Sequence, residues 1–188
     1  MPADLTLSLD ANDFVDAFWL EWDDHPQIGQ VTVPRAVTGA LKTYLFNEGG
    51  ITIDISGPPM SLGRCSNQGF NGNFATGDCV LLGDNPPGVM PVHLLFDPPV
   101  QAVGAHVSAT GPVGRAYLVN FSVLCDDGSG RKFSTNGTTS RQRGTAPFVG
   151  ARAPAGTGIT QIWFDVVDPA NQSDFARVAI NNLLWEIV

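Results

Sequence analysis

Short runs in which apolar and polar residues alternate restrict the fold of this sequence more than any other feature. Over residues 50–56, Ile51, Ile53 and Ile55 alternate with polar residues, which is the pattern of a strand with one buried face. The same pattern predicts further strands over residues 92–97, 100–109, 116–125, 147–152, 159–167 and 175–188. Because glycines and prolines separate these runs, we expect an all-β chain folded as an antiparallel β-sandwich or barrel.

Two segments depart from this alternation. Residues 12–22 are expected to form one short amphipathic helix, because Asn12 can cap it and apolar residues follow at spacings of three and four. Its apolar positions are Phe14, Val15, Phe18, Trp19 and Trp22. Residues 57–91 are rich in Gly, Asn and Pro and predict a long elaborated loop, with a short strand at 79–82; loops of this length are usually functional. Without repeats or linkers, residues 1–188 are expected to form a single domain.

Charge and hydropathy exclude several classes of protein. The hydrophobic share of 43% with only 15% charged residues excludes intrinsic disorder. The net charge of −8 argues against a nucleic-acid partner. No apolar run approaches the roughly 18 residues of a membrane span, so none is expected. The first residues lack a basic region followed by an apolar one, so we expect no signal peptide in the sequence as given.

The cysteines leave two interpretations open. Cys65 and Cys79 bracket a Gly/Asn-rich segment, and a disulfide that closed this loop would contribute about 3 kcal/mol in the chain-entropy model. The alternative is a pair of reduced thiols. Cys125 ends an apolar alternating run and is expected to be a small buried hydrophobic residue.

Residues 92–104, which read Val-His-Leu-Leu-Phe-Asp-Pro-Pro-Val-Gln-Ala-Val-Gly, resemble a signature of bacterial extracellular jelly-roll domains. These domains occur in PEP-CTERM surface proteins and are similar to galactose-binding-like carbohydrate-binding modules. Residues 148–150, 159–164 and 180–183 continue the order of that family, with Asn181 standing where the family has an acidic residue. The resemblance implies an antiparallel jelly-roll β-sandwich at the cell surface or outside the cell.

The predicted strand over residues 159–167 carries the candidate ligand site. Gln161, Trp163 and Asp165 share its outward face, and an indole beside a carboxamide and a carboxylate suits a sugar ring with its hydroxyls. His106 and Asn120 lie on the outward faces of other predicted strands and are expected to join this ligand-binding surface. The alternative is that the long loop or the N-terminal helix covers Trp163.

Asp165, Asp168 and Asp174 suggest a metal site. They place carboxylates at short intervals in a predicted loop, and Ca²⁺ takes six to eight oxygen ligands. The alternative is an ordinary solvated acidic turn. Calcium is the only cofactor that the sequence suggests.

No enzyme motif is present. The sequence has no Gly-x-Ser-x-Gly, His-Glu-x-x-His or phosphate-binding loop, and its three glutamates form no obvious catalytic pair. We therefore expect a non-catalytic module that binds carbohydrate or a cell-surface glycan. The alternative is a structural or assembly protein whose partner is another protein surface, with Trp19, Trp22 and the loop between Cys65 and Cys79 at the interface.

Overall fold

The chain is an antiparallel β-sandwich, which confirms the predicted fold class. The computed structural model describes residues 4–20, 22, 45–48, 51–56, 60–64, 73–74, 78–84, 92–170, 175 and 177–188. These residues form β1 (Thr6–Ser8), η1 (Ala11–Asp13), β2 (Phe18–Leu20), β3 (Leu45–Glu48), β4 (Ile51–Ser56), β5 (Met60–Arg64), β6 (Cys79–Asp84), β7 (Val92–Ala109), β8 (Ala116–Cys125), β9 (Gly130–Thr138), β10 (Phe148–Arg152), β11 (Ile159–Val167) and β12 (Arg177–Ile187). In this part of the chain, no helix has the length and apolar character needed to span a membrane.

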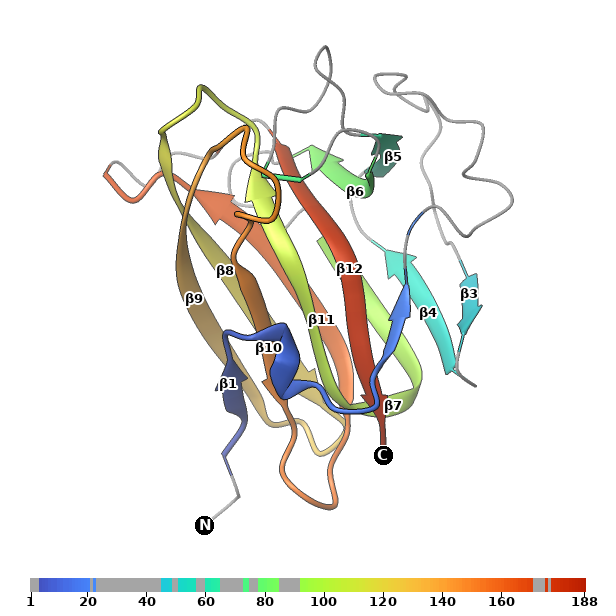
Figure 1. Ribbon diagram of the computed structural model, residues 1–188. Coiled ribbons are helices and arrows are strands. Elements are labelled where there is room, and N and C mark those ends of the chain that lie inside the picture. The colour runs from blue at the N-terminus through green and yellow to red at the C-terminus, as the bar shows by residue number, and fades with distance from the viewer. Residues whose placement is uncertain are drawn as a thin grey trace.

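The strands form two layers (Figure 1). In the first sheet the strand order is β3-β4-β7-β11-β8-β9. In the second sheet it is β1-β10-β7-β12-β6-β5, with β2 beside β12 beyond the end of β6. All of these pairings are antiparallel, so β7 is the strand that the two sheets share.

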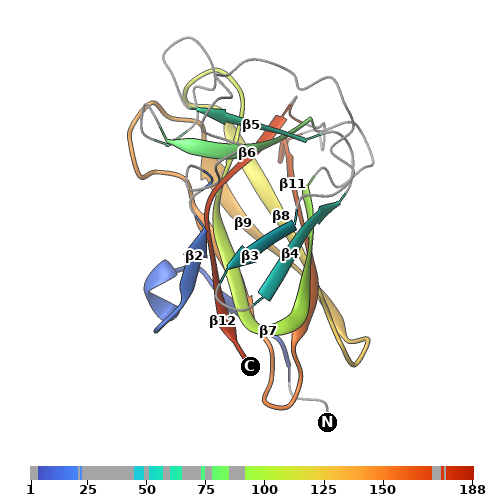
Figure 2. The ribbon, with the colours of Figure 1, turned by 90° about the vertical axis from the view of Figure 1, so that its right-hand side faces the viewer.

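Strand β7 is long enough to belong to both sheets. Its first half pairs with β4 and β11, whereas its second half pairs with β10 and β12. Figure 2 shows it bending like a U at one end of the sandwich. The bend lies at Asp97 and the two prolines that follow it, and the bond before Pro98 is cis. The two strands predicted over 92–97 and 100–109 are therefore one 18-residue strand.

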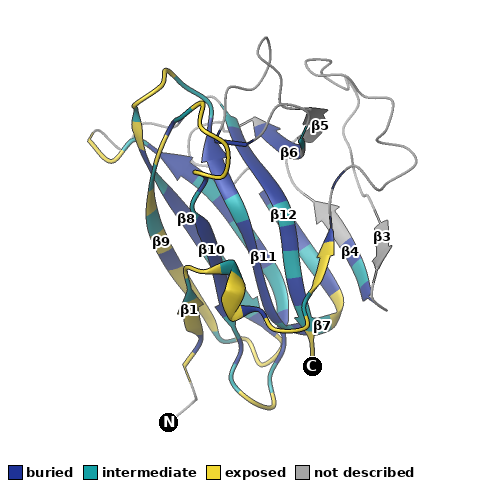
Figure 3. Cartoon of the chain, viewed as in Figure 1, coloured by how far each residue is buried: buried dark blue, intermediate teal, exposed yellow. Residues whose placement is uncertain are grey.

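The core fills the space between the two sheets. On β8 and β11 the alternate residues that point inward are fully buried, including Phe121 and Phe164, whose rings stack with centroids 4.9 Å apart. Trp22 and Trp185 are also fully buried in this core. Figure 3 shows that exposed residues gather in the N-terminal segment, on β9 and in the turns. The strands predicted over 116–125 and 159–167 thus bury mainly one face, whereas residues 148–151 of β10 are buried on both faces.

The helix predicted over residues 12–22 is wrong. Only a 3-10 turn forms, at Ala11–Asp13, and its cap is Asp10 rather than Asn12. The chain then passes through Asp16, at φ 59°, and continues as β2, whose residues pair with β12. The apolar residues recur at spacings of three and four because the chain here runs through a turn and then a strand, and not because they share one face of a helix. Hydrogen bonding along β12 replaces the helical hydrogen bonds that the spacing suggested.

The long loop predicted over residues 57–91 contains two strands. β5 and β6 form an antiparallel pair at the edge of the second sheet. The short strand expected at 79–82 is confirmed as β6, which extends to Asp84. Asn73 and Phe74 lie against the outer face of the second sheet, where Phe74 packs with Leu82 and Ala146. The described parts of this segment therefore add two strands and a small apolar cluster to the sandwich.

Candidate functional site

The outer face of the first sheet holds most of the predicted ligand-binding residues. Trp163 on β11 is paired with His93 on β7 and with Ser122 on β8, and Lys132 on β9 follows Ser122 in the same row. The inward positions next to this row are filled by the buried core, so these side chains point away from it. We call this row, together with Gln161, the Trp163 face.

The geometry of the Trp163 face is fixed by an aromatic pair. The imidazole of His93 stacks on the indole of Trp163, with centroids 4.6 Å apart and planes inclined by 10°. His93 Nε2 lies 3.0 Å from Gln161 Oε1, where it can donate a hydrogen bond to this acceptor oxygen. Stacking and hydrogen bonding together hold the three side chains in one arrangement.

The opposite side of the indole faces a small residue. Ser122 stands across from Trp163 on β8, so no large side chain from that position covers the ring. Farther along the face, Ser134 donates a hydrogen bond of 3.0 Å to Asn120 Oδ1. Carboxamide, hydroxyl and ammonium groups therefore share this face with a half-buried indole. This combination suits a ligand with both an apolar ring face and hydroxyl groups.

The structure brings Trp163, Gln161 and Asn120 together on one sheet, but His106 lies on the other. His106 is in the second half of β7, where it pairs with Phe148 and Asn181. The bend in β7 separates it from the Trp163 face, so the prediction that it joins that surface is wrong. His93 takes its place in the site. Period-two alternation around Val92 and Leu94 is the signal in the sequence that points His93 outward.

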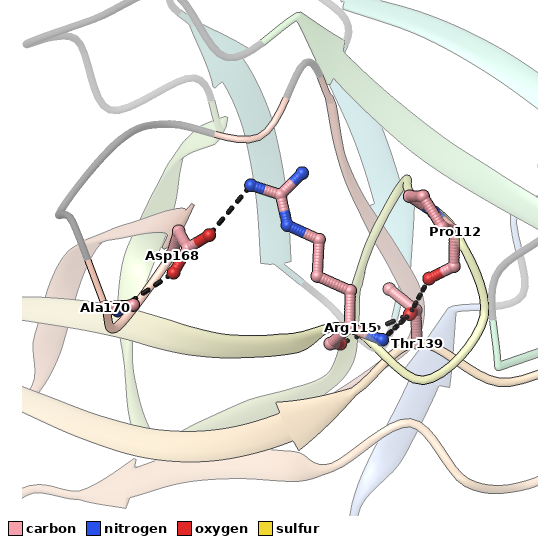
Figure 4. Close-up of polar contacts among 5 residues, drawn as sticks. All are labelled: Pro112, Arg115, Thr139, Asp168 and Ala170. Carbon is pink, nitrogen blue, oxygen red and sulfur yellow. Dashed lines mark hydrogen bonds and ion pairs between the residues drawn. The ribbon is translucent and has the colours of Figure 1, made fainter.

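The three predicted calcium ligands do not form one cluster among the described residues. Asp165 is on the outer face of the first sheet, Asp168 follows the end of β11, and Asp174 lies outside the described residues. Asp168 Oδ2 forms an ion pair of 2.8 Å with Arg115, and its Oδ1 accepts a hydrogen bond from the Ala170 N–H (Figure 4). Within the described ranges no group of three or more His, Cys, Asp or Glu side chains is arranged to hold a metal.

Other contacts hold Arg115 in the position where it forms the ion pair with Asp168. Its guanidinium lies 4.2 Å above the Phe175 ring, and its backbone N–H donates a 2.9 Å hydrogen bond to Thr139 Oγ1. The Thr139 hydroxyl in turn donates to the Pro112 carbonyl, as Figure 4 shows. These contacts tie the end of β11 to the turn between β7 and β8. The acidic residue at 168 is thus satisfied by the protein itself.

The disulfide prediction falls partly outside the described residues, because Cys65 is not among them. Cys79 opens β6 and pairs with Arg64, the last residue of β5. The bond between Cys65 and Cys79 therefore stays a prediction. Cys125 is a free thiol buried in the core, as expected, and burial raises its pKa above the usual value.

Asn73, which the sequence does not single out, is fully buried. Its Nδ2 donates hydrogen bonds to the carbonyls of Thr138 at 2.7 Å and Thr145 at 3.1 Å. Its Oδ1 accepts a 2.6 Å hydrogen bond from the N–H of Ser140. Nothing in the sequence around Asn73 distinguishes it from the other asparagines nearby, since its partners are about 65 residues or more away.

By its strand pairing, the chain is a two-sheet antiparallel β-sandwich with a polar–aromatic surface on its first sheet. Comparison with protein-family models, with curated proteins and with solved structures gives no match. The resemblance to the jelly-roll domains of PEP-CTERM proteins therefore stays a prediction. What the protein binds must be inferred from its own side chains.

Proposed function

We propose that this protein is a non-catalytic module that binds a neutral carbohydrate or cell-surface glycan through the Trp163 face. The observation that carries the proposal is the stacked pair of Trp163 and His93, held by the hydrogen bond from His93 to Gln161. An indole in a fixed position offers a flat apolar surface for the C–H groups of a pyranose. Because the pair is already ordered, little conformational entropy is lost when the ligand binds.

Charge favours a neutral glycan over an acidic one. The chain carries a net charge of −8, which repels polyanions over the range of the Debye length. Lys132, the cation in the same row as Trp163, is an exposed side chain on β9, and solvent weakens its attraction for an anion. Ser122 and Gln161 instead supply the uncharged donors and acceptors that hydroxyl groups need.

Affinity gel electrophoresis with neutral polysaccharides tests this proposal. Native gels that contain β-glucan, xylan, mannan or galactan should retard the wild-type protein in at least one case. Trp163→Ala should lower the affinity for that polysaccharide at least tenfold, or about 1.4 kcal/mol, and Trp163→Phe should restore part of it. Asn136→Ala, an exposed change elsewhere on β9, is the matched control. Absence of retardation, or retardation that Trp163→Ala leaves unchanged, would overturn the proposal.

An assembly role is the second candidate function, and exposed apolar residues in the N-terminal segment favour it. Leu9 is 53% exposed, Val15 70% and Trp19 65%. Trp22, which was expected at the same interface, is fully buried in the core and does not reach a partner. Multi-angle light scattering tests this candidate. A dimer at micromolar concentration that Val15→Asp dissociates would support it, and a monomer would exclude self-assembly.

The proposal has two further parts, which concern the location of the protein and a calcium site. A glycan ligand places the protein at the cell surface or outside the cell, where a disulfide between Cys65 and Cys79 would be stable. Calcium would have to use Asp165 and Asp174, or displace Arg115 from Asp168. A rise in Tm when EDTA is replaced by CaCl₂ would support a calcium site, and an unchanged Tm would count against it.

A further inference from the structure

A small pocket lies between the N-terminal segment and the outer face of the second sheet. Its volume is about 250 Å³, and it is lined by Ala11, Trp19, His106, Asn182 and Leu184. The pocket is separate from the Trp163 face, because His106 belongs to the half of β7 that pairs in the second sheet. It combines one large aromatic ring, two polar side chains and two apolar side chains.

A β-bulge on β12 places Asn182 in this pocket. Asn181 pairs with His106 and Leu184 pairs with Gly104, so β12 has one more residue than β7 between these two pairs. The extra residue is Asn182, which has a φ of 51°. Its backbone N–H donates a 2.9 Å hydrogen bond to Asn181 Oδ1, and Asn182 is one of the residues that line the pocket. A non-glycine residue held at positive φ is strained, and such strain is common at ligand sites.

The bulge also explains why the sequence hides this site. Val178 and Ile180 point into the core before the bulge, and Leu183 and Trp185 point into it afterwards. The inward positions thus change from even to odd numbers at Asn182. Regular alternation alone would not single this residue out.

His106 is oriented by two contacts. Its Nδ1 lies 3.1 Å from the carbonyl oxygen of Ala146, and because a carbonyl only accepts, Nδ1 carries the proton. The rings of His106 and Phe148 are also in T-shaped contact, with their centroids 5.3 Å apart. In this tautomer the neutral ring presents Nε2 as a hydrogen-bond acceptor. The acceptor is therefore fixed in position before any ligand arrives.

Trp19 supplies the aromatic ring of the pocket. It lies in β2 and pairs with Leu184 of β12, so strand hydrogen bonding fixes its backbone. Its side chain is nevertheless 65% exposed, whereas two other tryptophans, Trp22 and Trp185, are fully buried. An exposed indole beside a pocket with two polar groups offers a flat apolar surface to a ligand that has an apolar face.

We propose that this pocket is a second sugar site, which takes a single neutral pyranose ring such as the terminal unit of a glycan. Trp19 stacks on the ring, Asn182 and His106 Nε2 hydrogen bond to its hydroxyls, and Leu184 forms the apolar wall. The inference deepens the proposed function, on which it rests. Because the two sites lie on opposite faces of the sandwich, one molecule can hold two glycan chains at once.

Titration with single-ring probes tests the second site. The methyl glycosides of glucose, galactose, mannose and N-acetylglucosamine are titrated into the full chain and followed by ¹H–¹⁵N NMR. We expect at least one of them to bind, with Trp19→Ala and Asn182→Gly each lowering its affinity at least tenfold. Glycine adopts positive φ without strain, so Asn182→Gly removes the carboxamide and preserves the bulge. Val15→Ala, at an exposed residue outside the pocket, is the control.

The outcomes separate the second site from the first. If no methyl glycoside binds, or if Trp19→Ala and Asn182→Gly leave the affinity unchanged, the second site is overturned. Gel retardation by polysaccharide and its loss in Trp163→Ala are measured in parallel, and they report on the Trp163 face independently. If a glycoside binds and only Trp163→Ala weakens it, the first proposal stands and the second fails.

Discussion

Replacing Asn73 with alanine is expected to lower the free energy of unfolding by about 3 kcal/mol. Its carboxamide makes three hydrogen bonds of 3.1 Å or less, to the carbonyls of Thr138 and Thr145 and from the N–H of Ser140. Each such bond contributes about 1 kcal/mol net. A fourth contact, from Nδ2 to the Tyr117 hydroxyl at 3.4 Å, is too long to add much.

Asn73→Asp provides a sharper form of the same test. Aspartate keeps the oxygen that accepts from Ser140, but it places a second oxygen against the two carbonyls that Nδ2 now serves. At neutral pH this variant should therefore be less stable than Asn73→Ala. Protonation of the carboxyl restores one donor, so the folded variant binds a proton more tightly than the unfolded chain. Its stability relative to wild type should then rise as the pH falls.

Urea unfolding followed by tryptophan fluorescence measures both variants. In thermal unfolding, a loss of 3 kcal/mol corresponds to a decrease in Tm of about 6–12 °C for a chain of this length. Asn136→Ala, at an exposed position of β9, should stay within about 0.5 kcal/mol of wild type. The reasoning is refuted if Asn73→Ala also stays within this limit, or if Asn73→Asp is the more stable variant at neutral pH.

Three further predictions concern packing, titration and charge. A Cβ added at Gly137 would lie 2.2 Å from the Tyr117 ring, so Gly137→Ala should cost about 2–3 kcal/mol in urea unfolding, and a loss below 0.5 kcal/mol would contradict the packing. Burial raises the pKa of Tyr117 from 10.0 to about 12, so the folded state retains a proton that the unfolded state loses. Stability should therefore fall by about 3 kcal/mol as the pH rises from 10 to 12, and phenolate absorbance should show one late-titrating tyrosine that Tyr117→Phe removes. Asp168→Asn keeps an acceptor for the N–H of Ala170 and removes the charge that pairs with Arg115. It should cost about 0.5–1 kcal/mol at low salt and less in about 1 M salt, and equal costs at both salt concentrations would argue against a charge effect.

The parts of the fold that the sequence predicted are those in which a strand buries one face. β8 and β11 have inward and outward residues in strict alternation over most of their length, and their predicted ranges are the observed ones. The helix predicted in the N-terminal segment is wrong because the structure of this segment depends on a partner strand far along the chain. Phe18 lies opposite Trp185, and no local pattern signals that β12 extends past β6 to receive it.

The candidate site was predicted in part for the same reason. Trp163 and Gln161 share a strand, so their common face could be derived from their spacing. The error about His106 arose because the position of a residue on its strand fixes whether its side chain is inward or outward, but not which sheet that strand segment joins. Asn182 required knowledge of the bulge, which only the pairing with β7 defines.

The double membership of β7 has a consequence for how the molecule opens. Its first half is hydrogen bonded on both sides by β4 and β11, and its second half by β10 and β12. If either sheet came apart alone, half of β7 would lose its hydrogen-bond partners while the other half remained in place. Separate melting of the two layers is therefore costly, and we expect a single cooperative transition. In hydrogen exchange, amides in both halves of β7 should share the slowest rate, because they become accessible only when the whole sandwich unfolds.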